Sequence, residues 1–307
     1  MRRLALGSLL LLAPAPARCA EEGGAFLTLG AGARPAAMGG AYSAVGADAD
    51  AGAWNPAGLA RLEHSGLHIS HRESGIGNRY EVLSIARKTA RGTLSATGSY
   101  LGHDALSGRD ELGAPTGSFG AFDISAAAHY GVIPPFLETV ALGAGLRYVR
   151  SRIAEASAQT FAMDFGAHWR AREPLGPGTP SLGAALRNVG PGLRFLDQSS
   201  ALPLTASAGL GYSLPGGSLI DIDFIRRAHA SLNVFAAGLE VPLAKGFLAR
   251  LGYNSTAAQT SGGGVSEALS GLTSGFGLGL GPLSVDYAIA PMGELGLAQT
   301  LTLGTRF

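Results

Sequence analysis

The apolar residues of this chain are numerous but dispersed, and this feature restricts its fold more than any other. Hydrophobic residues make up 46% of the 307 residues, yet no apolar run approaches the roughly 20 residues of a membrane-crossing helix. Apolar residues instead alternate with small or polar ones over short segments. In the segment 161–170, one face would carry Phe161, Met163, Phe165, Ala167 and Trp169. Alternation with a period of two predicts β-strands that have one apolar face.

Fourteen segments show this alternation, and an even number allows the last antiparallel strand to pair with the first. The segments are Leu67–Glu73, Tyr80–Lys88, Thr93–Tyr100, Phe122–Tyr130, Ala141–Arg150, Phe161–Arg170, Ser181–Asn188, Leu204–Tyr212, Leu219–Phe224, Phe235–Val241, Phe247–Tyr253, Leu272–Leu280, Leu283–Ile289 and Thr300–Phe307. The sequence therefore predicts an all-β fold, a transmembrane antiparallel β-barrel of about 14 strands over residues 64–307.

A soluble sandwich with one wet face would show the same alternation, so composition has to separate the two. Glycine accounts for 47 residues, and only 15% of residues are charged against about 25% in typical domains. Glycine and small polar residues on the second face suit a crowded lumen, while the apolar face suits lipid. Composition thus favours the membrane barrel.

The connections between the segments alternate in length, as they do in outer-membrane barrels. Those expected to be periplasmic and short are Thr89–Arg91, Ile133–Glu138, Ala171–Pro180, Pro215–Gly217, Leu243–Gly246 and Gly281–Pro282. Those expected to be extracellular and longer include Gly102–Gly120, Ser151–Thr160, Gly190–Pro203 and Ser255–Ser270.

Both ends of the sequence point to the outer membrane of a Gram-negative type of cell. Residues 1–20 have the pattern of a signal peptide: a basic start, the apolar run Leu4–Leu12 and a small-residue region before the cleavage site. The single cysteine, Cys19, falls in this leader, so no disulfide is expected. The final residue, Phe307, ends an alternating strand and is the expected insertion signal for barrel assembly machinery.

Residues 21–63 do not alternate, and we expect them to fold back as a plug, or hatch, inside the barrel. The dipeptide Asn55-Pro56 is typical of a turn, and a short helix can begin at Pro56. Fourteen strands leave a bore too wide for side chains alone to fill. Arg34, Asp48 and Asp50 of the plug are either solvated charges or partners of lumen residues such as Arg147, Asp164 or Asp286. His168 is a further polar lumen candidate.

The plug carries a family resemblance. Its motif residues Met38, Gly39, Gly40, Trp54, Asn55, Pro56 and Ala57 resemble the N-terminal signature of PorV/PorQ-type outer-membrane proteins, which are relatives of the FadL β-barrels. Similar elements follow in the same order at Met163–Gly166, Arg187–Gly190, Leu202–Leu204, Arg250–Asn254 and Asp286–Ala288. The resemblance implies a fourteen-stranded barrel with an N-terminal plug.

Two functions follow from these features. The first is a plugged channel for the uptake or export of small apolar or amphipathic compounds. The alternative, implied by the resemblance, is a protein-interaction barrel that serves protein secretion as a shuttle or anchor of the type IX kind. The expected partners are outer-membrane lipid and either a hydrophobic small molecule or secreted proteins.

Other function classes receive little support from the residues. No nucleophile, base and orienting group are arranged as in a catalytic triad, so we expect no enzyme and no cofactor. His64, His68 and His71 lie close together, but His71 would face away from the other two on a strand, and we expect no metal site from them. The formal net charge of +1 gives no basis for binding nucleic acid.

Overall fold

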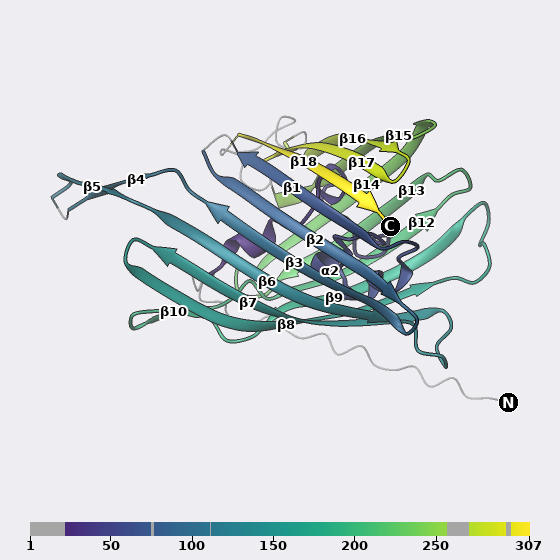
Figure 1. Cartoon of the computed structure of the whole chain (residues 1–307), viewed down its shortest axis with the longest axis horizontal. Coiled ribbons are helices and arrows are strands. Elements are labelled where there is room, and N and C mark those ends of the chain that lie inside the picture. The colour runs from purple at the N-terminus through teal and green to yellow at the C-terminus, as the bar shows by residue number, and fades with distance from the viewer. Residues whose placement is uncertain (1–21, 75–76, 111, 257–269, 293–295) are drawn as a thin grey trace.

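The computed structural model describes residues 22–74, 77–110, 112–256, 270–292 and 296–307. Within these ranges, fourteen antiparallel strands form a closed barrel in which β1 pairs with both β2 and β18 (Figure 1). The barrel strands are β1 (Gly66–Ser74), β2 (Arg79–Thr89), β3 (Gly92–Gly102), β6 (Ala121–Val132), β7 (Val140–Ile153), β8 (Ala156–Arg170), β9 (Thr179–Val189), β12 (Thr205–Ser213), β13 (Leu219–Arg227), β14 (Leu232–Ala244), β15 (Phe247–Asn254), β16 (Leu272–Leu280), β17 (Leu283–Pro291) and β18 (Leu297–Arg306). The predicted fold class is confirmed, and each predicted segment coincides with one barrel strand.

The two faces of the wall differ as the alternation predicted. On β8, Phe161 is 57% exposed on the outer face, whereas the neighbouring lumenal Asp164 is 0% exposed. On β18, Leu301 and Leu303 are exposed and the intervening Thr302 is buried. A closed barrel with an apolar outer face fits an outer-membrane location. None of the helices in the described residues has the length and apolar character needed to cross a membrane.

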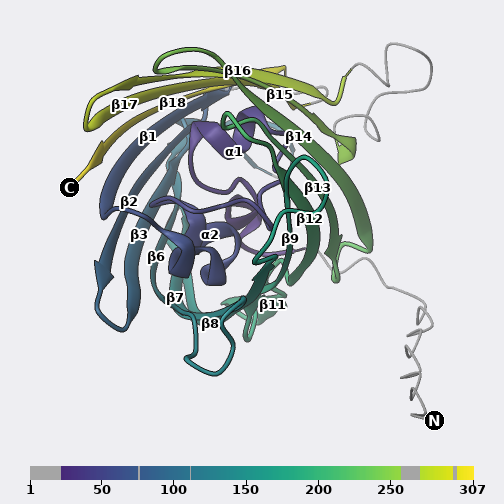
Figure 2. The ribbon, with the colours of Figure 1, turned by 90° about the vertical axis from the view of Figure 1, so that its right-hand side faces the viewer.

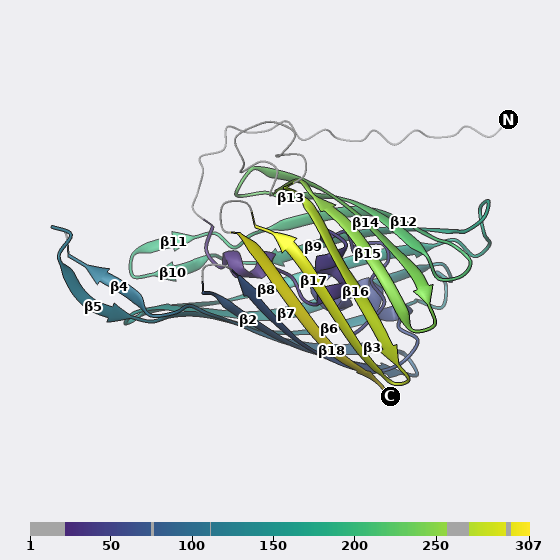
Figure 3. The ribbon, with the colours of Figure 1, turned by 90° about the horizontal axis from the view of Figure 1, so that it is seen from above.

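The two ends of the barrel carry different connections. The end that holds the start of β1 and Phe307 has mostly short turns, and we call it the turn end. The opposite end, which we call the loop end, carries hairpins that extend beyond the wall (Figure 3). Phe307 lies just after β18, where its N–H donates to the carbonyl oxygen of Ser65 at 2.9 Å.

One of the predicted long connections is wrong, whereas Gly102–Gly120 and Gly190–Pro203 do join barrel strands as long connections. The stretch Ser151–Thr160 is not a loop, because the β7–β8 ladder continues to the pair Ile153 and Ala156. Ala154 closes this hairpin with φ of 52°, a conformation that glycine or asparagine usually supplies, so the turn had no sequence signal. The other two connections contain hairpins: β4 (Leu106–Arg109) with β5 (Pro115–Phe119), and β10 (Leu193–Phe195) with β11 (Gln198–Ser200).

Residues 22–63, which we call the lumenal segment, lie inside the ring of strands (Figure 2). Its regular elements are short: η1 (Ala25–Thr28), α1 (Ala33–Ala37), α2 (Ala51–Trp54) and η2 (Pro56–Arg61). The helix predicted from Pro56 is therefore present, as one 3₁₀ helix. The predicted leader, residues 1–20, lies outside the described residues, as does most of the predicted loop Ser255–Ser270.

Glycines of the wall make room for the lumenal segment. A Cβ atom added at Gly131 on β6 would lie 2.8 Å from the carbonyl oxygen of Pro56. One added at Gly238 on β14 would lie 2.6 Å from the Cβ of Met38, and one at Gly275 on β16 would lie 2.6 Å from the Cβ of Ala37. Real Cβ atoms do not approach other heavy atoms so closely. The glycine content of the chain thus reflects close packing of the wall against its own N-terminal segment.

Candidate functional site

The interior of the barrel is the candidate site, and Asn55 fixes the lumenal segment within it. The Asn55 side-chain Oδ1 accepts from the Ala57 N–H at 3.1 Å and so caps η2, where Pro56 occupies the first helical position. The Asn55 Nδ2 donates to the carbonyl oxygen of Ser43 at 2.8 Å and to that of Ala167 on β8 at 3.1 Å. The buried Asn55 side chain therefore connects the start of η2 with the turn at Ser43 and with strand β8.

Trp54 forms the apolar centre of the segment. Its indole N–H donates to the carbonyl oxygen of Ala31 at 2.9 Å, and its ring meets the ring of Tyr42 edge-on with centroids 6.2 Å apart. The Arg187 guanidinium of β9 lies 5.5 Å from the Trp54 ring centroid and donates to the carbonyl oxygen of Ala53 at 2.8 Å. A tryptophan held on three sides in this way is a rigid part of the filling of the bore.

The motif Met38-Gly39-Gly40 packs directly against β15. Met38 is fully buried, and Gly39 and Gly40 have φ values of 68° and 82°. The Asn254 side-chain amide donates to the carbonyl oxygen of Gly39 at 2.6 Å. The glycines let the chain turn against the wall at Gly252, where a side chain would collide with Met38 and Gly39.

Charged groups connect the segment to the wall, but through partners other than the predicted ones. Arg34 pairs with Glu240 of β14 at 2.8 Å and with Asp48 at 3.3 Å, and Asp50 contacts His68 of β1 at 2.7 Å. The expected pairing of Arg34, Asp48 and Asp50 with Arg147, Asp164 or Asp286 is therefore wrong. Those three wall residues lie in the lumen but are paired within the wall.

Arg250 of β15 completes this first network by donating to Glu240 at 2.5 Å and to Asp286 of β17 at 2.6 Å. Within the segment, the Tyr42 hydroxyl donates to Asp48. Burial alone would raise the pKa of Asp48, but His68 and Arg34 outweigh it and lower that pKa below its ordinary value.

A second network occupies the opposite side of the lumen. Arg147 of β7 donates to Asp164 of β8 at 2.7 Å, and His129 of β6 contacts the same carboxylate at 3.0 Å. The Asn188 N–H donates to the other oxygen of Asp164 at 2.8 Å, at a bulge between β8 and β9. His168 donates instead to the segment, through Nε2 to the carbonyl oxygen of Ala44 at 2.8 Å.

A charged cavity of ≈ 420 Å³ lies between the lumenal segment and the wall at the turn end. The first network, which contains Arg34, Glu240 and Arg250, lies at the inner end of this cavity. The cavity opens near the strand ends at the turn end of the barrel. The lining includes Asp48, His68, Arg250, Asp286, Arg61 and Arg306.

Two further cavities, of ≈ 320 and ≈ 250 Å³, lie at the loop end and share the lining residues Thr28, Leu29, Arg72 and Met292. We call them together the loop-end vestibule. Their other lining is largely apolar and includes Phe26, Leu101, Trp54, Ala36, Pro291 and Ala298. Arg72 is the cation of this lining that donates to the segment, through Nη1 to the carbonyl oxygen of Leu29 at 2.9 Å.

The lumenal segment separates the two ends of the lumen. Met38, Tyr42 and Leu59 of this segment are fully buried. The small cavity beside Tyr80, Arg147 and Arg187 has ≈ 10 Å³, about the space of a single water. In this conformation, the middle of the bore is therefore packed with protein.

Sequence reasoning did not single out several of these lumenal groups as site residues. The main omissions are Arg72, His129, Arg187, Asp221, Asp223, Glu240 and Arg250. Asp221 and Asp223 accept from the backbone N–H groups of Ala44 and Tyr42. In the sequence, each of these wall residues is a charged or polar residue on the face of an alternating strand that otherwise carries small residues. That position shows that the side chain points into the lumen, but it does not identify the partner.

The fold is similar to two toluene transporters of known structure. TbuX of Ralstonia pickettii gives a TM-score of 0.58 at 13% identity, over 91% of this chain and 98% of that chain. TodX of P. putida gives 0.58 at 12% identity, over 91% of this chain and 99% of that chain. No protein-family model matches the sequence, and no curated protein matches it. At these identities the likeness shows the barrel fold, and the PorV/PorQ resemblance stays a prediction.

Proposed function

We propose that this protein is an outer-membrane channel for small apolar or amphipathic compounds, and that the lumenal segment is its plug. The loop-end vestibule carries the proposal, because it is an apolar recess in a lumen otherwise lined by polar groups. Apolar recesses with a few polar groups are the usual form of small-molecule sites. The likeness of the barrel to two toluene transporters supports a channel and not an enzyme.

Passage through the bore requires the segment to move. Its anchors are separate hydrogen bonds and ion pairs to several strands, and its own helices are no longer than six residues. Such short elements have little stability of their own, so displacement costs mainly the contacts with the wall. A compound that enters the vestibule contacts Leu29 and Trp54 directly, and its binding can therefore favour a displaced state.

Binding to the vestibule can be followed through Trp54. The chain has two tryptophans, and the second, Trp169, lies near the turn-end limit of β8. In a Trp169→Phe variant in detergent micelles, bromobenzene should quench the remaining fluorescence saturably, because the heavy atom would sit beside the Trp54 ring. A Leu29→Glu substitution should abolish the saturable component by placing a charge in the recess.

The matched control is Trp54→Phe, in which Trp169 is the reporter. It should show only the linear quenching expected from bromobenzene dissolved in the micelle. Equal, unsaturable quenching of both tryptophans would contradict the vestibule as the binding site.

The protein-interaction barrel is the second candidate, and the β4–β5 hairpin favours it. This hairpin projects from the loop end with Leu112 94% exposed and Leu106 40% exposed (Figure 1). A secreted partner recovered by crosslinking from native membranes, and lost when residues 104–119 are deleted, would support this function. PorV/PorQ membership belongs to the same proposal.

A further inference from the structure

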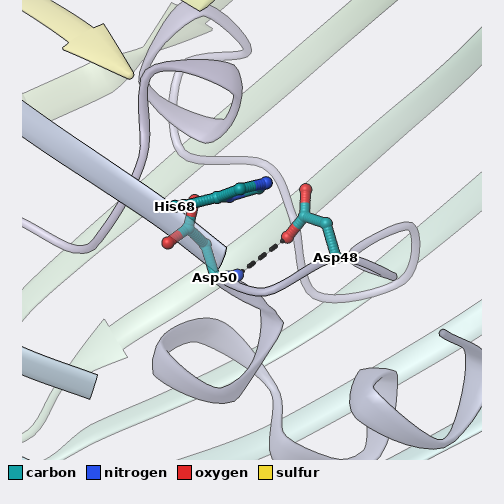
Figure 4. Close-up of side chains that lie close together, drawn as sticks. All are labelled: Asp48, Asp50 and His68. Carbon is teal, nitrogen blue, oxygen red and sulfur yellow. Dashed lines mark hydrogen bonds and ion pairs between the residues drawn. The ribbon is translucent and has the colours of Figure 1, made fainter. Parts of the chain in front are cut away.

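Three residues with metal-binding side chains meet where the lumenal segment touches β1. Asp48 and Asp50 lie just before α2, and His68 projects from the lumenal face of β1 (Figure 4). Each offers one ligand atom, and these atoms all lie within 4.8 Å of one another. A zinc-type ion with bonds of about 2.1 Å needs ligand atoms roughly 3.4 Å apart, so small side-chain shifts suffice.

The oxygen atoms of Asp50 are not fully used by protein. Its side chain is 3% exposed, and its Oδ2 contacts the His68 Nδ1 at 2.7 Å. Its Oδ1 is buried without a hydrogen-bond partner among the described residues. A buried carboxylate oxygen without a donor is costly, and it therefore points to a missing cation or proton donor.

Charge counting within the connected network gives the same indication. Four carboxylates, those of Asp48, Asp50, Glu240 and Asp286, are joined by only two guanidinium groups, Arg34 and Arg250. With a protonated His68 the network carries one uncompensated negative charge, and with the neutral His68 that a metal ion requires it carries two. Arg61, Arg170 and Arg306 line the same cavity but form no ion pair with these carboxylates in the described part of the chain.

The cluster is accessible from the turn end, because Asp48 and His68 line the charged cavity. Water in that cavity can supply the remaining coordination positions. One imidazole nitrogen with two carboxylates suits zinc, cobalt or manganese better than calcium or magnesium, which prefer oxygen ligands alone.

We propose that Asp48, Asp50 and His68 bind one divalent transition-metal ion of the zinc type. The ion neutralises the two excess charges and links the segment to β1, the strand that closes the barrel. It therefore holds the segment in place independently of what the channel carries. Sequence reasoning grouped His68 with His64 and His71, whereas the structure places it with two aspartates instead.

The test is isothermal titration of zinc chloride into the full-length protein in micelles, after removal of metal with a chelator. We expect one ion per chain, and at least a tenfold weaker affinity for Asp50→Asn and for His68→Gln. His71→Gln should bind as the unmodified protein does, because His71 lies on the outer face and bonds to Glu81 at 2.6 Å. His64→Gln, at the cavity mouth, is the second control.

Cobalt absorption gives a readout that folding defects do not imitate. With cobalt in place of zinc, the unmodified protein and His71→Gln should show the visible bands of a low-symmetry nitrogen-and-oxygen site, and His68→Gln should lose them. Heat-modifiable migration on gels confirms that each variant is a folded barrel. A folded unmodified protein that binds no ion, or a His68→Gln variant that binds equally well, would overturn the proposal and leave His68 as an ion-pair partner of Asp50.

Discussion

The barrel wall and the lumenal segment are built by opposite means. Each wall strand pairs with two neighbours over most of its length, so its stability comes from a continuous backbone ladder. The segment has four helices of four to six residues and depends on individual contacts with the wall. The difference suggests that the wall is the stable frame and that the segment is the part that can move.

The largest effect should come from breaking the ion pairs that hold the segment. Glu240→Gln removes the carboxylate shared by Arg34 and Arg250, and leaves two guanidinium groups short of a partner. We expect a loss of about 3 kcal/mol of unfolding free energy, measured by denaturant titration in micelles. Glu81→Gln is the control, since its pair with the outer-face His71 is about half exposed and contributes at most about 1 kcal/mol. Equal losses of unfolding free energy in both variants would show that the ion pairs to the segment stabilise the protein no more than an ion pair on the outer face.

A smaller effect should follow from filling the space that wall glycines leave. Gly143→Leu places a side chain where Pro56 and Ala57 now lie, and should displace η2 from β7. We expect a loss of about 1–3 kcal/mol and an increase in single-channel conductance in planar bilayers. Gly98→Leu on the outer face of β3 provides the matched control, because a Cβ there meets nothing within 4 Å. Unchanged conductance in Gly143→Leu would show that η2 does not obstruct the bore.

The smallest effect concerns the cap of η2. Asn55→Ala removes the acceptor for Ala57 and both Nδ2 hydrogen bonds. We expect a loss of about 1–2 kcal/mol, together with faster protease cleavage within residues 22–63. Asn55→Asp keeps the cap acceptor but loses the donors, so its cleavage rate should lie between those of the other two forms. A cleavage rate unaffected by Asn55→Ala would mean that this anchor is unimportant.

The wall could be predicted because each strand shows its two faces in its own residues. Ile220, Ile222 and Phe224 alternate with Asp221 and Asp223, and the structure exposes the first set and buries the second. The same local rule failed at Ala154, where a left-handed turn occurs without glycine or asparagine.

The pairings inside the lumen could not be predicted, because they depend on how far around the barrel each strand lies. Arg34 meets Glu240, which is 206 positions away in the chain, and Asp50 meets His68 only because β1 closes the ring beside α2. Alternation fixes which residues point inward, whereas partner choice requires the register of fourteen strands and the path of the segment.

The central claim is that the lumenal segment closes the bore and must move for a compound to pass. A disulfide that fixes the segment to the wall tests this claim. Ser43 of the segment and Ser207 of β12 have hydroxyl oxygens 3.0 Å apart, so cysteines at both positions should form a disulfide in a Cys19→Ser background. With bromobenzene as the probe of the proposed class of small apolar compounds, we expect saturable uptake by proteoliposomes to fall to the empty-vesicle rate when this variant is oxidised, and to recover on reduction. The single-cysteine variants should respond to neither treatment. Equal uptake by the oxidised and reduced double variant would contradict the account.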